Sequence, residues 1–263
     1  MDFDELGFLG EQIVNISQAI YVENIEAFDL CYALNKFAQE LKFLFIINKE
    51  DSQEVAASCL FVKVLNGFQS SVLLYKYGLS VEGRIIIRTV LESAFILKAI
   101  CDKREYAQDF IEIDNKDRER FGKAINDKRN EDIFKAIKGE IPEYLYENLK
   151  KENREKGIKM ISVEDWAKRA DLEEFYQCAY RLLSMDIHTN PRALEIYMNL
   201  DENKKLINIV TSPITQGIND NLIIASSILL TSIESLSKLF SFDKFKDIEN
   251  FEDKIEYLSN KYL

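Results

Sequence analysis

The stretch GRIIIRTVLESAFIL, residues 83 to 97, has the composition of a helix that is apolar on most sides. Three charged residues, Arg84, Arg88 and Glu92, interrupt it at intervals of four. At roughly 100° per residue, Arg88 lies near 40° and Glu92 near 80° from Arg84, so the three share one side of the helix. The pattern predicts a helix that packs into a core and carries a polar stripe.

This polar stripe has two interpretations, because burying an unpaired charge costs several kcal/mol and partners are therefore required. Glu92 can pair with Arg88 one helical turn away, and this pair would then only fix how the helix packs. Alternatively, Arg84 and Arg88 form an anion-binding corner in which their guanidinium groups hold a phosphate or carboxylate.

Helical periodicity extends from this stretch through most of the chain. The 263 residues include only three prolines and nine glycines, which favours long helices over many short strands. We expect Gly78 to end one helix and Ser80 to cap the next. The fold class that follows is all-α, a multi-helix bundle. Long helical segments are expected at 24–49, 52–78, 172–190 and 221–240.

A change of composition at Asp102 divides the chain without making a second domain. Residues 102–159 are densely charged with sparse apolar positions, which predicts surface helices, broken at Pro142 and Gly157. We therefore expect a single all-α domain, 1–263, with its core at about 24–101 and 160–240. The one β-like stretch is 207–217.

Net charge and composition limit the classes of partner. The formal charge is −11, so the chain has no general attraction for nucleic acid or an anionic membrane. The basic segment 149–159 could form a local patch, although a solvated helix face is the simpler interpretation. The start, MDFDELGFLG, has no basic region typical of a signal peptide. We expect a cytoplasmic protein with no membrane contact, in which Cys31, Cys59, Cys101 and Cys178 are buried, reduced thiols.

A second polar stripe lies in YRLLSMDIH, residues 180 to 188. Arg181 and His188, the only histidine of the chain, are seven residues apart and lie within about 20° of each other on a helix, with Ser184 within roughly 60° of both. An arginine and a histidine on one helix face suit a phosphodiester, because they supply a cation and an acid–base group. We expect this stripe to face Arg84, Arg88 and Glu92 inside the bundle.

The spacing R-x6-H near the end of an apolar helix resembles the motif of the HEPN superfamily. The order of features is also similar to a bacterial family of unknown function with a G-L-S-x-E-G-R-x3-R-x3-E helix, a charged segment, a tryptophan and Y-R-x2-S-x3-H. These correspond here to Gly78 to Glu92, the segment after Asp102, Trp166 and Tyr180 to His188, over roughly residues 50 to 200. The resemblance implies an HEPN-like core with a charged helical insertion.

The same resemblance implies a function. It would make the protein a metal-independent ribonuclease or toxin, in a bacterial stress or antiphage setting, with RNA as substrate and a cognate antitoxin or defence partner. Arg181 and His188 would be catalytic, supported by Arg84, Arg88 and Ser184. One histidine cannot be acid and base at once, so either a homodimer supplies a second His188 or Glu92 serves with a pKa raised by burial.

One residue departs from the pattern, because Leu182 stands where HEPN nucleases usually carry a polar residue. Together with the acidic composition, it favours an alternative. In this alternative the chain is a non-catalytic helical protein whose Arg/His pocket binds an anionic ligand or stabilises a homodimer interface. Neither alternative involves a metal or a cofactor, because the sequence has no H-E-x-x-H, Cys/His cluster or glycine-rich phosphate loop.

Overall fold

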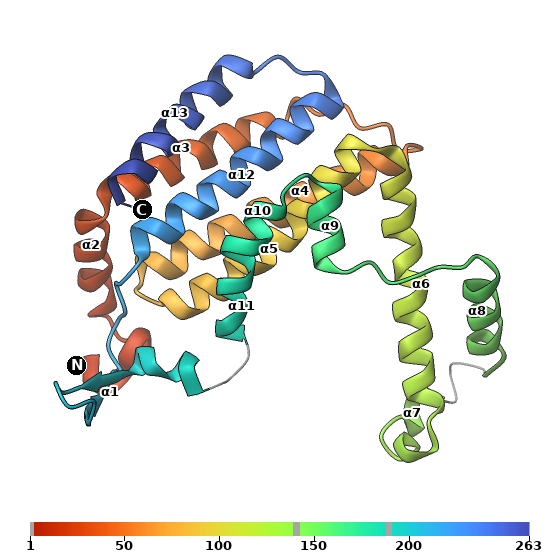
Figure 1. Cartoon of the computed structure of the whole chain (residues 1–263), viewed down its shortest axis with the longest axis horizontal. Coiled ribbons are helices and arrows are strands. Elements are labelled where there is room, and N and C mark those ends of the chain that lie inside the picture. Colours follow the sequence, from red (N-terminus) through yellow and green to blue (C-terminus); the bar gives the residue numbers. More distant parts are fainter. Residues whose placement is uncertain (1–2, 139–142, 188–190, 263) are drawn as a thin grey trace.

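The computed structural model describes residues 3–138, 143–187 and 191–262, and within these residues the prediction of an all-α fold is confirmed (Figure 1). The long helices are α2 (Ile13–Glu23), α3 (Ile25–Leu41), α4 (Ser52–Lys76), α5 (Ser80–Asp102), α6 (Arg104–Asn126), α8 (Glu143–Glu155), α12 (Ile218–Phe240) and α13 (Phe245–Tyr262). The short helices are α1 (Phe3–Leu6), η1 (Gly7–Leu9), η2 (Lys128–Asn130), α7 (Lys135–Lys138), α9 (Val163–Arg169), α10 (Glu173–Phe175), η3 (Tyr176–Tyr180), α11 (Arg181–Ile187) and η4 (Pro191–Tyr197).

Helix α12 is the centre of the bundle, between α3 and α13 on one side and α4 and α5 on the other (Figure 1). It is apolar but rich in serine and threonine, and these hydroxyls donate to backbone carbonyls one turn earlier. Ser232 donates to the Ile228 carbonyl at 2.9 Å, and Ser235 donates to the Thr231 carbonyl at 2.8 Å. These hydroxyls are therefore satisfied within the helix and need no partner side chains.

By length and composition alone, α4 and α12 could each cross a membrane. However, 50% of the most apolar window of α4 and 67% of that of α12 are buried inside the bundle, as in core helices of soluble proteins. The expectation of no membrane contact stays a prediction.

The α4–α5 turn is built around Gly78, where α4 was expected to end. Gly78 has φ +72°, its N–H donates to the Tyr75 carbonyl at 3.0 Å, and the next N–H donates to the Leu74 carbonyl at 2.9 Å. This is a Schellman motif, which favours glycine at the left-handed position. The predicted capping role of Ser80 is wrong. Its hydroxyl donates to the Ile214 carbonyl instead, because the segment leading into α12 lies against this turn.

Glycines also allow α4 and α5 to pack at close range. A Cβ atom at Gly67 would overlap Cγ2 of Val90, and a Cβ atom at Gly83 would lie 2.8 Å from the ring of Tyr75. At each of these two points one helix carries no side chain, so a side chain of the other helix can lie against its backbone.

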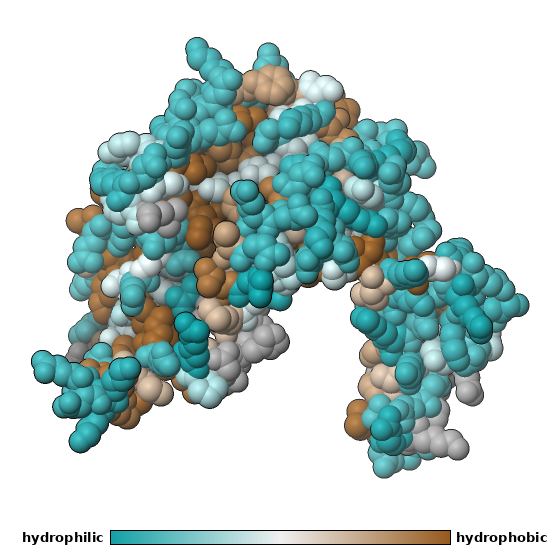
Figure 2. Space-filling view, in the orientation of Figure 1, coloured by the Kyte–Doolittle hydropathy of each residue, from teal (hydrophilic) through white to brown (hydrophobic). Residues whose placement is uncertain are grey.

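The charged segment after α5 forms an arm that extends away from the bundle (Figure 1). Helix α6 runs outward, and α7 and α8 contact it. The arm is mostly hydrophilic (Figure 2), and Ala107 and Ile125 are the buried residues of α6. Gly157, with φ +64°, follows the end of α8 as the sequence indicated, whereas Pro142 lies outside the described residues.

Three expectations about local structure need correction. The helix expected at 24–49 ends at Leu41, as α3. The segment 172–190 was expected to be one regular helix, but a π-helical turn, η3, separates α10 from α11. The β-like stretch contributes only β2 (Leu206–Ile209), which pairs antiparallel with β1 (Met198–Leu200) in a two-stranded hairpin.

The four cysteines also do not share one environment. Cys31 is buried and Cys101 is half-buried, but Cys59 and Cys178 are exposed, so the prediction of four buried thiols is wrong. Apolar neighbours along the chain indicated burial, but at Cys59 and Cys178 the helix turns this position outward. Burial raises the pKa of the Cys31 thiol to about 12.

The close packing of α4 on α5 predicts that Gly67→Ala changes the free energy of unfolding in opposite directions in two backgrounds. Alanine is the better helix former by about 1 kcal/mol, yet we expect Gly67→Ala to lower the free energy of unfolding, because overpacking costs about 1–3 kcal/mol. In a Val90→Ala background the obstructing methyl groups are absent, so Gly67→Ala should raise the free energy of unfolding. Urea denaturation of wild type, both single variants and the double variant measures both effects. Stabilisation by Gly67→Ala in the wild-type background would contradict the packing described.

Candidate functional site

Four side chains from α5 and the segment opposite it form one polar cluster, the Arg88 cluster, made of Arg88, Glu92, Tyr180 and Ser184. The Arg88 guanidinium lies 2.8 Å from Oε1 of Glu92 and donates through Nε to the Ser184 hydroxyl at 3.0 Å. It also donates to the Tyr180 hydroxyl, which in turn donates to Oε1 of Glu92 at 2.7 Å. The two helices are thus joined by charge-assisted hydrogen bonds in which every member has a partner.

The π-helical turn η3 positions Tyr180 for this role. Its ring is buried, stacks on Tyr176 with centroids 5.1 Å apart, and lies 4.6 Å from Cζ of Arg88. The Ser184 hydroxyl donates to the Tyr180 carbonyl at 2.6 Å. Burial, and then the hydrogen bond to Glu92, raise the pKa of Tyr180 to about 12. The phenol therefore stays protonated at neutral pH and can donate to Glu92.

The Arg88 cluster is only partly shielded from water, since the exposed fractions of the Arg88 and Glu92 side chains are 20% and 29%. The first interpretation of the stripe, an Arg88–Glu92 pair that fixes packing, describes these contacts. The expectation that the two stripes face each other is met for Arg88, Glu92 and Ser184, which the structure brings together.

Two of the other predicted site residues, Arg84 and Arg181, lie outside this cluster. Arg181 is exposed and donates to Gln177 at 2.9 Å, so the prediction that it faces inward is wrong. Tyr180 and Leu183 occupy the inward face, and Arg181 is about 100° from Tyr180 on the helix. His188 lies outside the described residues.

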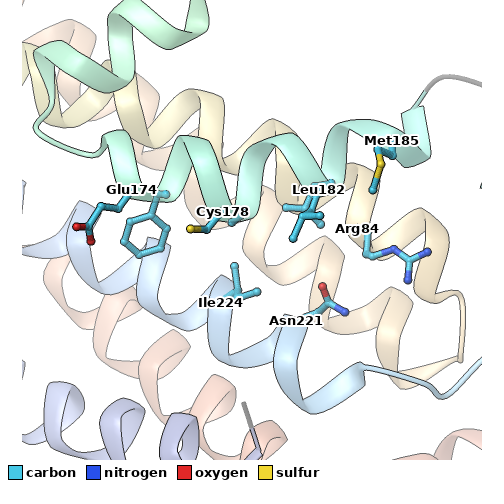
Figure 3. A pocket seen from close by; sticks show the side chains of 10 residues that line it. Arg84, Glu174, Cys178, Leu182, Met185, Asn221 and Ile224 are labelled. Carbon is cyan, nitrogen blue, oxygen red and sulfur yellow. The ribbon is translucent and has the colours of Figure 1, made fainter.

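Arg84 lines a groove of about 650 Å³ that runs along the outer face of the α10–α11 segment (Figure 3). Helices α5 and α12 contribute the opposite side, and apolar surface is visible beside this segment in Figure 2. In Figure 3, Glu174 and Arg84 lie toward opposite ends. The groove residues are Arg84, Glu174, Phe175, Cys178, Ala179, Leu182, Leu183, Met185, Asn221 and Ile224.

Asn221, in the first turns of α12, is the polar group most enclosed by the groove. Its exposed fraction is 8%, and its Nδ2 donates to the Gly217 carbonyl at 2.6 Å. That bond fixes which amide atom is the oxygen. Within the described chain Oδ1 has no hydrogen-bond partner, and Figure 3 shows the side chain directed into the groove. The groove therefore offers a hydrogen-bond acceptor at Asn221 and donors at Arg84.

Sequence reasoning missed two residues that matter here. Tyr180 stood directly before Arg181 in the quoted motif, and a tyrosine with a reachable hydroxyl beside two charged residues was an available signal. Asn221 had a weaker signal, as an amide at the start of an apolar helix. Among the described residues there is no group of three or more His, Cys, Asp or Glu side chains that could hold a metal ion.

Comparison with known proteins gives one match. A family model described as a family of unknown function, DUF5677, matches residues 54–206, which is more than half of the chain. The matched span is close to the region of about 50 to 200 that contains the quoted motifs. No curated protein and no solved structure matches the chain. The description names no superfamily, so the HEPN resemblance stays a prediction.

The Arg88 cluster predicts how stability responds to loss of one hydroxyl. We expect Tyr180→Phe to lower the free energy of unfolding by about 1–2 kcal/mol at neutral pH, because the hydroxyl both accepts from Arg88 and donates to Glu92. The exposed Tyr144→Phe is the control and should change little.

The same variant predicts a pH dependence. The pKa of Tyr180 is raised in the folded state. The contribution of its hydroxyl to the free energy of unfolding is therefore fully present below about pH 10 and is lost as the pH rises through about 12. The difference in unfolding free energy between wild type and Tyr180→Phe should therefore shrink across that window. Urea denaturation at a series of pH values measures it, and a constant difference would exclude the proposed hydrogen bonding.

Proposed function

The chain belongs to the DUF5677 family, and we propose that it is a non-catalytic, ligand-binding helical protein. The observation that carries this proposal is the groove along the α10–α11 segment, with its largely apolar wall and two polar side chains, Arg84 and Asn221. Its volume of about 650 Å³ lies within the range of small-molecule sites. Its occupant would be a small, mainly apolar ligand that binds against Leu182 and Ile224.

The polar groups define the rest of the ligand. A guanidinium has five N–H donors, so Arg84 can keep contacts within the chain and still donate to a carboxylate or sulfonate. Asn221 Oδ1 accepts only, so it favours a ligand with an amino or hydroxyl donor. Glu174 repels an anion at the far end of the groove and so sets the direction in which the ligand binds. An apolar acid with one N–H or O–H group meets all three conditions.

The Arg88 cluster supports a role without catalysis. Arg88, Glu92 and Ser184 are bonded to one another or to Tyr180, so they serve to hold the α10–α11 segment on α5. Leu182 supports the same conclusion, since it occupies the polar position of the HEPN motif and is an exposed part of the groove wall.

Anilinonaphthalene sulfonate tests the groove directly, because it combines two apolar ring systems with a sulfonate and a secondary amine. We expect it to bind the folded protein with a rise in fluorescence and a rise in Tm. Leu182→Glu, at a position 62% exposed, should weaken binding at least about tenfold, because it places a second carboxylate in the groove. Val62→Glu, exposed on α4 outside the groove, is the matched control. Binding that is absent, or unchanged by Leu182→Glu, would overturn the proposal.

A metal-independent ribonuclease is the second candidate, and the exposure of Arg181 favours it. The Arg88 cluster holds in place the segment that carries Arg181. The Arg181 guanidinium is exposed to solvent, where it could contact an RNA phosphate. His188 would supply acid–base chemistry, with a second copy from a homodimer, and toxicity would then require an antitoxin or defence partner. The attack of a 2′-hydroxyl on the adjacent phosphate would need no metal.

RNA cleavage in the presence of EDTA separates the two candidates. If the second one holds, Arg181→Ala and His188→Ala should each reduce the cleavage rate by about 10²–10⁴ and leave the Tm nearly unchanged. Arg154→Ala removes an exposed arginine on α8 and should have no effect. Lack of cleavage by the wild-type protein would exclude the ribonuclease and would leave ligand binding unaffected.

A further inference from the structure

The β1–β2 hairpin exposes apolar side chains that nothing in the described chain covers. Its strands pair Met198 with Ile209 and Leu200 with Leu206, and all four side chains are exposed. The register shifts between these pairs, which leaves Ile207 without an opposite residue and 66% exposed. Every residue of both strands is exposed, so neither face of the hairpin packs on the bundle.

Such a hairpin is not expected to be stable alone in water. An isolated two-stranded hairpin needs a third strand or a packed surface to be ordered. Both outer edges carry unpaired backbone groups, and edge strands are usually protected by charged residues or proline. Neither Met198–Leu200 nor Leu206–Ile209 contains a charged residue or a proline. The hairpin therefore has the properties of an interaction surface.

We propose that this surface binds the same hairpin of a second copy of the chain, across a two-fold axis. An antiparallel strand edge is complementary to itself under such an axis, as an isologous interface requires. With strands of only three and four residues, backbone pairing would be weak, so burial of Leu206, Ile207 and Ile209 supplies most of the contact.

Charge favours a second copy at this surface. The whole chain carries a formal charge of −11, so two copies repel each other in general. The hairpin is an exception, because Asp201 and Glu202 in its turn are balanced by Lys204 and Lys205. A contact between hairpins thus brings two locally neutral surfaces together, and it places no like charges opposite each other along the strands.

Sedimentation of the full chain at micromolar concentration tests the interface. The wild-type protein should sediment as a dimer of the 30.6 kDa chain. Ile207→Lys combined with Ile209→Lys should raise the dimer dissociation constant by more than about tenfold, because two lysines would be placed at the centre of the contact. Ile133→Lys, at an exposed apolar position on the arm, should leave the dimer intact.

Hydrogen exchange of wild type keeps the test independent of whether a variant folds. The backbone amides of residues 206–209 should exchange more slowly as protein concentration rises, while those of α12 should not depend on concentration. A monomeric wild type would overturn the proposal. A dimer that tolerates both lysines, or that leaves the exchange of residues 206–209 independent of concentration, would also overturn it. None of these three outcomes bears on ligand binding in the groove.

Discussion

The Arg88 guanidinium sets the position of the segment on which both candidate functions depend. It bonds to Glu92 on its own helix and to Tyr180 and Ser184 across the contact with η3 and α11. An arginine left without such partners at a half-buried position would destabilise the packing, so the two elements can meet in few ways. Once Tyr180 and Leu183 face α5 and the core, the opposite side of the segment must face outward.

That outward side accounts for both the groove and the position of Arg181. Leu182 and Cys178 form one wall above α12, and Asn221 lies beneath with its oxygen unsatisfied within the described chain. Arg181 is exposed to solvent and donates to Gln177. The polar residues that first suggested one active centre are therefore divided between a cluster that fixes packing and positions that can contact a ligand.

Helices and their ends were predictable from local pattern. The 3.6-residue periodicity located α3, α4 and α5, and a glycine at position 78 predicted a helix end that the backbone there confirms. Ser162 caps α9 by accepting from the Asp165 N–H at 3.0 Å, a contact between residues three apart in the sequence. These features depend on atoms within a few residues of each other, so a single sequence contains nearly all the information needed.

By itself the sequence determined the all-α fold, the charged arm and the Arg88–Glu92 pair, whose members are one helical turn apart. Tertiary structure alone decided that Tyr180 completes this pair, that Arg181 faces solvent and that Asn221 points into a groove. A helical wheel gives the angles between residues of one helix, but it does not give the rotation of that helix against its neighbours. This rotation is set by packing between α5, α11 and α12, which are far apart in sequence, and it decides which residues share a site.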